Sequence, residues 1–175
     1  MSGFPPLADG RSRILILGSF PSVKSLANQR YYGNPLNHFW DLVALSFGTS
    51  KPDLADFGAA QEWLLDLGLA IWDTIGTCVR PGSLDQNIRL AQANDIAALL
   101  RRWPKIRRIL LNGGAAAGYF TKLIAPTLLP PLPEVWKLPS SSPIPSRNYR
   151  KLEDKLPVWK SALLGNKDLT GPVVQ

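Results

Sequence analysis

The 175-residue sequence contains one cysteine, Cys78, and one histidine, His38. A single cysteine excludes an intramolecular disulfide, a cysteine-ligated iron–sulfur cluster and a cysteine-rich zinc site. A single histidine makes a histidine-based metal site implausible, and a Ser-His-Asp triad would have to be built around His38. We therefore expect no metal and no cofactor, and we expect any chemistry to use Asn, Asp, Ser or backbone groups.

Long hydrophobic runs and targeting signals are also missing. No apolar stretch approaches the roughly 18 to 20 residues that span a bilayer. The first ten residues, MSGFPPLADG, lack the charged and apolar regions of a signal peptide. The sequence therefore predicts a soluble, cytoplasmic protein that is not secreted and has no membrane partner.

Length and composition limit the domain organisation. Hydrophobic residues make up 45% of the chain, which allows one sizeable core but is too little, at this length, for two ordinary domains. We expect a single domain over residues 12–165, with flexible tails at 1–11 and 166–175. We also expect the protein to be a monomer.

Positive charge exceeds negative charge. The sequence has 20 Lys and Arg against 13 Asp and Glu, for a net charge of +7 and an isoelectric point of about 9.8. The cations gather in two clusters, Arg101, Arg102, Lys105, Arg107 and Arg108, and Arg147, Arg150, Lys151 and Lys155. Such a balance favours a polyanionic partner, and the alternative is a solvated surface that keeps the protein soluble.

Alternating strand and helix patterns predict the fold class. Four apolar runs, each followed by small or turn-forming residues, have the composition of buried parallel strands: 14–17, 69–72, 109–111 and 135–138. Helical spacing marks five further stretches: 37–47, 58–67, 84–103, 115–124 and 151–164. The pattern predicts a three-layer α/β/α sandwich around a small, mainly parallel four-stranded sheet.

In such sheets ligands bind beyond the carboxyl ends of the strands, where all four post-strand loops begin. The first loop is GSFPS, residues 18–22, hereafter the GSFPS turn. Gly18 and Pro21 predict a sharp bend that turns backbone groups toward the cleft.

The stretch after this turn, YYGNPLNHFW, is rich in aromatic and amide side chains. One interpretation is structural: Asn37 caps a helix that begins near His38, and Phe39 and Trp40 enter the core. The other is functional, because two tyrosines and two asparagines at a strand end are what a pocket for a flat base requires.

The motifs GSFPS, YYGNPLNHFW, IWDTIGTCVRPGSLDQNI and LPSSSP, in this order and spacing, resemble the family 6 branch of the uracil-DNA glycosylase superfamily. The resemblance extends from about residue 14 to residue 164. It implies the fold of that superfamily and excision of a deaminated base, hypoxanthine or uracil, from DNA.

Two positions depart from the pattern that the resemblance implies. Phe20 stands where most branches of the superfamily place a catalytic Asp or Asn, and a phenyl ring cannot polarise water. The resemblance assigns the catalytic asparagine of family 6 to Asn37, with Asn34 in the same loop as the alternative. Leu36 stands where an arginine is expected, which puts a local phosphate or base contact in doubt.

Glycosidic cleavage produces an oxocarbenium-like sugar and moves negative charge onto the departing base. An asparagine carbonyl can orient water toward C1′, and backbone N–H groups can stabilise the charge on the base. We expect Asn37 in the first role, the turn at residues 19–22 in the second, and Phe39 either stacked on the extruded base or in the core. The expected base pocket consists of Gly18, Ser19, Phe20, Pro21, Ser22, Tyr32, Phe39, Asp73 and Asn112.

Two of these residues have equally simple structural interpretations. Asp73 could accept a hydrogen bond from a base N–H, or it could cap a turn together with Thr74. Asn112, before Gly113 and Gly114, could contact phosphate or base, or it could be a turn residue.

The segment PSSSPIPS, residues 139–146 and hereafter the serine loop, resembles the minor-groove loop of the superfamily. Its serines suit phosphate contacts, and Ile144 between two prolines suits insertion into the base stack. The expected DNA-binding residues are Lys24, Ser140, Ser141, Ser142, Pro143, Ile144 and Arg147.

The strand-end motifs hold no lysine apart from Lys24, which predicts hydrolysis without a covalent lysine intermediate. The expected partner is DNA with a deaminated base or an abasic site, and binding to it would place the protein at the nucleoid. Two alternatives remain: a weakly catalytic or non-catalytic binder of damaged or abasic DNA on the same fold, motivated by Phe20, and an unrelated small α/β hydrolase or nucleotide-binding protein. The sequence contains no phosphate-loop or nucleophile-elbow motif, which argues against the hydrolase or nucleotide-binding alternative.

Overall fold

The computed structural model describes residues 1–82 and 84–165. Its centre is a four-stranded parallel sheet in the order β2-β1-β5-β6. The strands are β1 (Ile14–Gly18), β2 (Leu69–Asp73), β5 (Arg108–Asn112) and β6 (Glu134–Leu138). All four expected strands are present, each lengthened by one or two residues.

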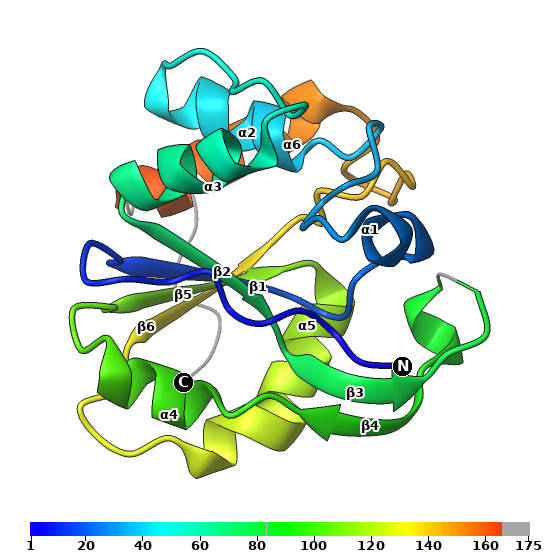
Figure 1. The fold of residues 1–175 in the computed structure, drawn as a ribbon, viewed down its shortest axis with the longest axis vertical. Helices are drawn as coiled ribbons and strands as arrows, with labels where there is room; N and C mark the ends of the chain where they lie inside the picture. Colours follow the sequence, from blue (N-terminus) through cyan, green and yellow to red (C-terminus); the bar gives the residue numbers. More distant parts are fainter. Residues whose placement is uncertain (83, 166–175) are drawn as a thin grey trace.

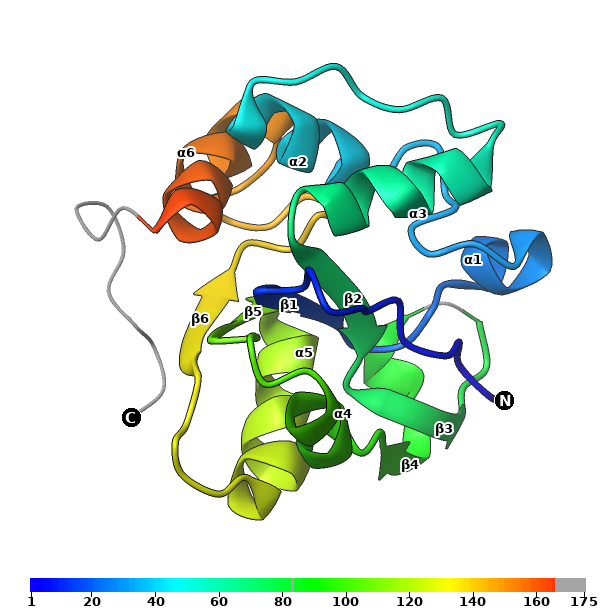
Figure 2. The ribbon, with the colours of Figure 1, turned by 60° about the vertical axis from the view of Figure 1, so that its left-hand side comes forward.

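Helices cover both faces of this sheet (Figures 1 and 2). One face packs against α2 (Phe39–Phe47), α3 (Phe57–Asp66) and α6 (Leu152–Leu164). The other packs against α4 (Ile96–Arg102), α5 (Gly114–Tyr119) and the π-helical turn η2 (Phe120–Ile124) that continues α5. The three-layer α/β/α architecture predicted from the sequence is confirmed.

The two hydrophobic cores follow from strand alternation. Ile16, Ile71 and Leu110 are fully buried on the α2, α3 and α6 face. Leu15, Leu17 and Ile109 are equally buried on the other face. Because successive side chains point to opposite faces, strands buried on both sides are apolar throughout, which explains the continuous runs in the sequence.

The expected helix at 84–103 is wrong in its first half. That segment forms a short 3-10 turn, η1 (Asp85–Asn87), and a strand, β4 (Arg89–Ala93), before α4 begins. β4 pairs antiparallel with β3 (Ile75–Val79), which the sequence analysis did not predict. The helix begins only at Ile96, and its N-cap is Asp95, whose side chain accepts a hydrogen bond from the Ala98 N–H at 2.8 Å. The helical spacing of apolar residues was misleading here, because residues 89–93 form a strand only by pairing with β3, which the local sequence does not reveal.

The helix boundaries near the first two strands also differ from expectation. α2 begins at Phe39 rather than Asn37, with His38 as its N-terminal flanking residue. A short helix that was not expected, α1 (Val23–Asn28), follows the GSFPS turn, and Ser22 caps it by accepting from the Ser25 N–H. A 3-10 turn of three residues, η3 (Ala125–Thr127), follows η2.

Residues 1–11 lie along the edge of the sheet rather than forming the expected flexible tail. Leu7 exchanges two backbone hydrogen bonds of 3.0 Å with Ile71 in the outer strand β2. Gly3 donates to the Gly76 carbonyl at 2.8 Å. The segment therefore satisfies part of an otherwise open strand edge. The second expected tail, 166–175, lies outside the described residues.

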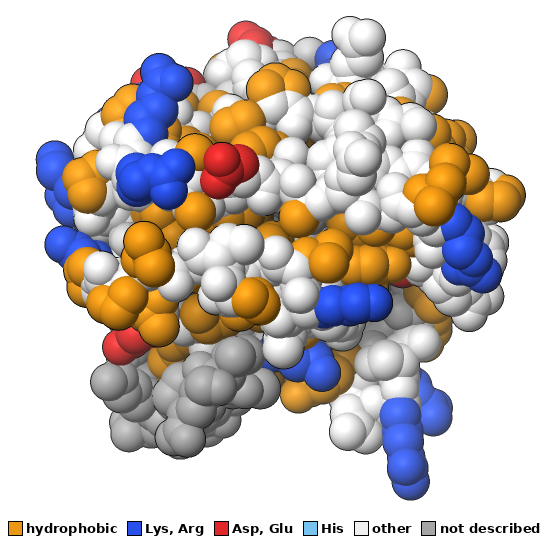
Figure 3. Space-filling view, turned by 90° about the horizontal axis from the view of Figure 1, so that it is seen from below, with side chains coloured by type: hydrophobic (Ala, Val, Ile, Leu, Met, Phe, Trp, Pro, Cys, Tyr) orange, Lys and Arg blue, Asp and Glu red, His pale blue; other side chains and the backbone are white. Residues whose placement is uncertain are grey.

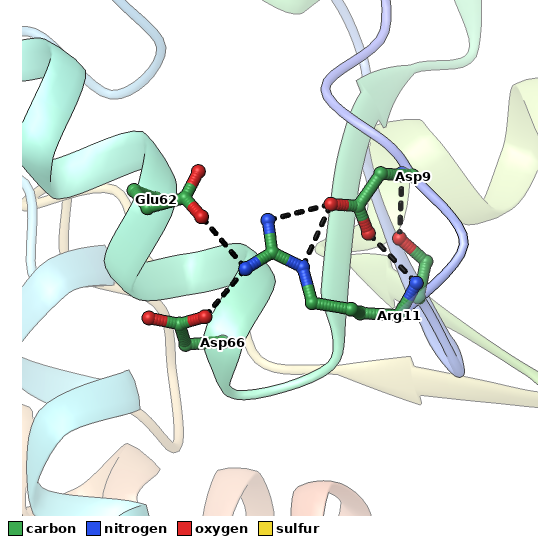
Figure 4. A network of polar contacts seen from close by, with 5 residues as sticks. Asp9, Arg11, Glu62 and Asp66 are labelled. Carbon is green, nitrogen blue, oxygen red and sulfur yellow. Dashed lines mark hydrogen bonds and ion pairs between the residues drawn. The ribbon is translucent and has the colours of Figure 1, made fainter.

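Arg11 joins this N-terminal segment to α3 (Figure 4). Its guanidinium contacts Asp9 at 2.6 Å, Glu62 at 2.7 Å and Asp66 at 2.5 Å. Proximity of these carboxylates raises the pKa of Arg11, mainly through the hydrogen bonds with Glu62 and Asp9. The network is exposed, so its role is to orient the segment more than to stabilise the fold.

Figure 3 shows the molecule from the side of α4 and η2, which is the lower side in Figure 1. Lys and Arg side chains are scattered over this face, with hydrophobic side chains between them. Within the described residues, no helix combines the length and the apolar character that crossing a membrane requires.

Candidate functional site

A cavity of about 270 Å³ opens at the carboxyl edge of the sheet. This volume lies near the lower end for small-molecule pockets, which are roughly 300 to 1,000 Å³, and suits one small flat ligand. The lining residues come from all the post-strand loops: Gly18, Ser19, Phe20, Pro21, Ser22, Lys24, Ser25, Tyr31, Tyr32, Asn34, Asn37, Asp73, Asp85, Asn112, Ser140, Ser141, Ser142, Pro143 and Ile144. Of the expected site residues, only Phe39 and Arg147 are missing from this lining.

The GSFPS turn forms one wall and is fixed from behind. The Ser19 carbonyl accepts from the Ile75 N–H at 3.0 Å and from the Thr74 hydroxyl at 3.2 Å. Phe20 is 6% exposed and lies below the Arg80 guanidinium, 5.0 Å from its ring centre. Arg80 also donates to the Pro21 carbonyl at 2.6 Å. Phe20 therefore supports the turn and offers the cavity no polar group.

Tyr32 provides the flat aromatic surface of the cavity. Its backbone has a φ of 50°, which a non-glycine residue rarely adopts. Its ring is stacked on Phe39, with 3.8 Å between centroids and 10° between the planes. Phe39 is fully buried behind Tyr32 and also contacts Trp40 and Trp159. Phe39 is thus placed in the core, and the ring that faces the cavity is Tyr32.

Asn34 and Asn37 both line the cavity, and both also shape their loop. The Asn37 Oδ1 atom accepts from the Phe39 N–H at 3.0 Å, and the Asn34 Oδ1 atom accepts from the Leu36 N–H at 3.2 Å. Each amide oxygen has two lone pairs, so each retains one acceptor site and an NH₂ group for a ligand. For Asn37 the structural and functional interpretations are therefore compatible. Leu36 points outward and is 64% exposed.

Two carboxyl groups, those of Asp73 and Asp85, lie in the cavity wall. Among the described residues, neither forms a salt bridge with a Lys or Arg side chain. Asp73 ends β2 and is 5% exposed, and burial raises its pKa to about 7, with a further contribution from Asp85. Asp85, in η1, accepts a hydrogen bond from the Ser19 hydroxyl at 2.8 Å. Burial also raises the pKa of Asp85, which the Ser19 hydrogen bond partly offsets.

Asn112 connects the cavity floor to the serine loop. Its Nδ2 atom donates to the Ser141 hydroxyl at 2.9 Å and to the Tyr32 hydroxyl at 3.2 Å, and its Oδ1 atom accepts from the Ser141 N–H at 2.8 Å. Burial raises the pKa of Tyr32, so its hydroxyl remains protonated. These contacts, all with protein groups, agree with the structural interpretation of Asn112 as a turn residue.

The serine loop is held from below by α6 and by His38, which precedes α2. Lys155 of α6 is 1% exposed, and its ammonium group donates to the Ser142 carbonyl at 2.7 Å and lies 3.2 Å from His38 Nδ1. Burial lowers the pKa of Lys155 and, together with the Lys155 charge, that of His38. Trp159 donates its indole N–H to the Pro139 carbonyl at 2.9 Å. Ile144 projects from this support and is 63% exposed.

The remaining expected contacts lie at the rim or outside the cavity. Lys24 of α1 lines the rim, whereas Arg147 is exposed beyond the serine loop. Sequence reasoning missed Arg80, Asp85 and Lys155 as site components. No local pattern distinguishes them from other surface-type residues, because their roles depend on contacts with distant segments.

Among the described residues, no three His, Cys, Asp or Glu side chains gather as metal ligands would. The available groups are amides, hydroxyls, two carboxyls and one flat ring. Such a set can hold a planar heterocycle and orient a water molecule beside it.

Comparisons with known proteins agree with this arrangement. Residues 5–163 match the model of the uracil DNA glycosylase superfamily. A Methanosarcina acetivorans protein named hypoxanthine DNA glycosylase is 39% identical over 117 residues, 67% of this chain and 73% of that protein. A Methanosarcina barkeri protein of the same name is 31% identical over 131 residues, 70% of this chain and 82% of that protein.

A solved structure is similar over nearly the whole chain. It is a solution NMR structure of a candidate uracil DNA glycosylase from Methanosarcina acetivorans, 34% identical, with a TM-score of 0.74. The match covers 93% of this chain and 95% of that one. The likeness therefore includes both the sheet and the loops that form the cavity.

Proposed function

The chain belongs to the uracil DNA glycosylase superfamily and is a DNA N-glycosylase, and we propose that it excises hypoxanthine, and to a lesser extent uracil, by hydrolysis. The observation that carries this proposal is the cavity at the sheet edge, with Tyr32 as a flat wall and amide groups around it. The names of the two Methanosarcina relatives support hypoxanthine as the main substrate.

The geometry suits a base that has left the DNA helix. Tyr32 stacks on the extruded base, with Phe39 behind it as a rigid support. Asn37 orients a water molecule toward C1′ through the free lone pair of its Oδ1 atom. The backbone of the GSFPS turn, fixed by Arg80, stabilises the charge that develops on the base. Asn34 is the alternative to Asn37 for the water, because it lines the same cavity.

DNA binding in this proposal uses the rim of the cavity. The serine loop contacts phosphates, and Ile144 fills the space that the extruded nucleotide leaves. Lys24 in the cavity lining and Arg147 after the serine loop provide positive charge. The protein acts as a single-domain monomer on DNA that contains a deaminated base, in the compartment that holds the DNA.

The reaction leaves an abasic site without a covalent intermediate. Lys155, although its pKa is lowered, is buried and bonded to the Ser142 carbonyl, so it is not positioned to attack the sugar. We expect no DNA adduct to be trapped when borohydride is added during turnover. A reduced adduct that disappears in the Lys24→Ala or Lys155→Met variant would identify a lyase instead.

The decisive experiment is an excision assay on duplexes that contain hypoxanthine, uracil, xanthine or a thymine mismatch. Asn37→Ala should reduce the single-turnover rate on hypoxanthine by about 100-fold or more, as expected when a group acting on the transition state is removed. Asn34→Ala should have a smaller effect. Leu36→Ala, an exposed residue of the same loop, is the matched control and should retain full activity.

Two outcomes would contradict this proposal. If none of the four bases is released, the chain is not an active glycosylase on these substrates. If turnover is present but unaffected by Asn37→Ala, while abasic DNA is bound tightly, the chemistry does not depend on Asn37.

A further inference from the structure

A second hollow of the surface lies at the end of the sheet opposite the cavity, where β5 and β6 begin. It is a groove of about 360 Å³ that shares no lining residue with the cavity of the candidate site. Three segments line it: α4, through Leu100 and Arg101; the residues before β5, among them Ile106 and Arg107; and the segment 127–133 before β6. We call it the proline groove, after the prolines of segment 127–133.

The proline groove is apolar, and its sides are firmly supported. Ile106 is 4% exposed, and Leu100 and Leu128 pack against the hydrophobic core on this face of the sheet. Leu129 also lines the groove but is 81% exposed, so its side chain is available for contact. The prolines of segment 130–133 fix the backbone φ, so this side of the groove has little freedom to lose on binding. An exposed apolar hollow of this kind marks an interaction site.

Positive charge surrounds the same groove. Arg101 and Arg107 line it and are exposed, and the exposed Arg102 and Lys105 lie beside them in the chain. Among the described residues, none of these four side chains forms a salt bridge. The C-terminal dipole of α4 attracts the charges of Arg101 and Arg102, which are in its last turn. It does not account for Lys105 and Arg107, which follow the helix.

DNA bound for base excision does not account for these charges either. The cavity opens at the other end of β5, about one strand length from the groove. Exposed charges are largely screened beyond about 8 Å at physiological salt. The cations of the groove therefore have a negatively charged partner other than the DNA at the cavity.

We propose that the proline groove binds an acidic linear segment of a partner protein, one in which large apolar side chains alternate with Asp and Glu. The apolar side chains fill the groove between Leu100 and Leu129, and the carboxylates pair with Arg101 and Arg107. Charge complementarity selects this occupant, because the groove combines an apolar lining with cations that lack salt-bridge partners among the described residues. This inference goes beyond the proposed function: the partner binds while the cavity remains open to DNA.

Two other occupants match the groove less well. Residues 166–175 follow α6, whose Ala162 carbonyl accepts from Arg108 at the same end of the sheet. That segment contains one Lys and one Asp, so its side chains carry no net charge to complement the cations. A single-stranded nucleic acid complements the cations, but the described residues that line the groove include no aromatic ring on which a base stacks.

The experiment selects a phage-displayed library of random linear peptides on the full chain, with Leu129→Ser as the counter-selected protein. We expect the selected peptides to combine Asp and Glu with Leu, Ile or Phe. Fluorescence anisotropy of a synthetic, labelled copy of the strongest binder then measures its affinity. Leu129→Ser should weaken binding about 10-fold. The Arg101→Ala and Arg107→Ala pair should weaken it by a similar factor at low salt, and by less as the salt concentration rises.

Two matched controls test whether the effect is local to the groove. Leu132→Ser changes a leucine of the same segment that is 62% exposed and lies outside the lining. Lys122→Ala removes an exposed cation of η2, also outside the lining. Both should leave the affinity within about twofold of the wild type, since surface substitutions away from a contact change little. All the substituted side chains are exposed, so each variant should fold.

Four results would overturn the proposal. One is a selection that returns no peptide preferring the wild type over Leu129→Ser, and another is a set of selected peptides without an excess of Asp and Glu. The third is displacement of the labelled peptide by a single-stranded oligonucleotide or by a synthetic peptide with the sequence of residues 166–175, either of which would identify a different occupant. The fourth is competitive inhibition of hypoxanthine excision by the peptide, which would place it at the cavity.

Discussion

At the scale of single residues, Asp73 gives the fold a pH dependence opposite to that of a salt-bridged carboxylate. Its pKa is about 7 in the folded protein, mainly through burial, against an ordinary value of 3.8. Between these values the folded state holds the proton more tightly than the unfolded chain. The contribution of Asp73 to stability is therefore greatest at low pH and is lost as the pH rises through about 7.

We predict that replacing Asp73 with Asn removes this dependence. In the wild type, the free energy of unfolding should fall by at most about 1.4 kcal/mol per pH unit between pH 5 and 7 on account of this one group. Asp73→Asn should flatten that slope and should equal or exceed the wild type in stability at pH 8. Urea denaturation of both proteins at pH 5, 6, 7 and 8 measures the difference. Parallel curves at every pH would mean that Asp73 is not protonated in the folded state.

At the scale of elements, the serine loop is the clearest example of a segment positioned by others. It has no regular structure of its own, yet three segments each supply a hydrogen bond to it: β5 through Asn112, the residue before α2 through the His38 N–H, and α6 through Lys155. Ser141 is consequently 1% exposed, although it lies in a loop of serines and prolines. This support fixes the position from which Ile144 projects.

We predict that Lys155→Met loosens this loop without unfolding the domain. Methionine keeps the length of the lysine stem up to Cε and removes the buried ammonium group, so global stability should change little. The Ser142 carbonyl loses its donor, and excision should slow by about 10-fold, chiefly through weaker DNA binding. Hydrogen exchange of a peptide covering 139–151 should become faster, while a peptide covering β1 should remain unchanged. Unaltered exchange in both peptides would show that Lys155 is dispensable for the loop.

At the scale of the whole molecule, the two basic clusters of the sequence lie at opposite ends of the sheet. Arg101 and Lys105 precede β5, whereas the cavity opens where β5 ends, at Asn112. A five-residue strand spans roughly 13 Å, and exposed charges are largely screened beyond about 8 Å at physiological salt, so a phosphate bound at the cavity interacts weakly with Lys105. Arg147, by contrast, directly follows the serine loop.

We predict that the two clusters contribute differently to DNA binding. Arg147→Ala should reduce the slope of log K against log salt by about one unit, because one phosphate contact is lost. Lys105→Ala removes the same charge and should leave the slope unchanged. Binding of a hypoxanthine duplex to both variants across a salt series measures this. Equal slopes for the two variants would place the DNA elsewhere on the surface.

Predictability from sequence also depends on scale. The four strands and their loops were predictable because a buried parallel strand has a continuous apolar run, visible within five residues. β4 was not, because Arg89–Ala93 is a strand only through its pairing with β3. For the same reason Arg80, Asp85 and Lys155 went unnoticed, whereas Tyr32 and Asp73 lie next to recognisable strand ends.

The close approach of the Asp73 carboxyl to Gly18 has a consequence for how this protein could change. Any side chain at position 18 would collide with the Asp73 carboxyl, so the two positions cannot vary independently. A lineage or a mutant library that enlarges residue 18 must therefore also move or shorten the side chain at position 73. A library that reshapes this part of the cavity should randomise both codons together.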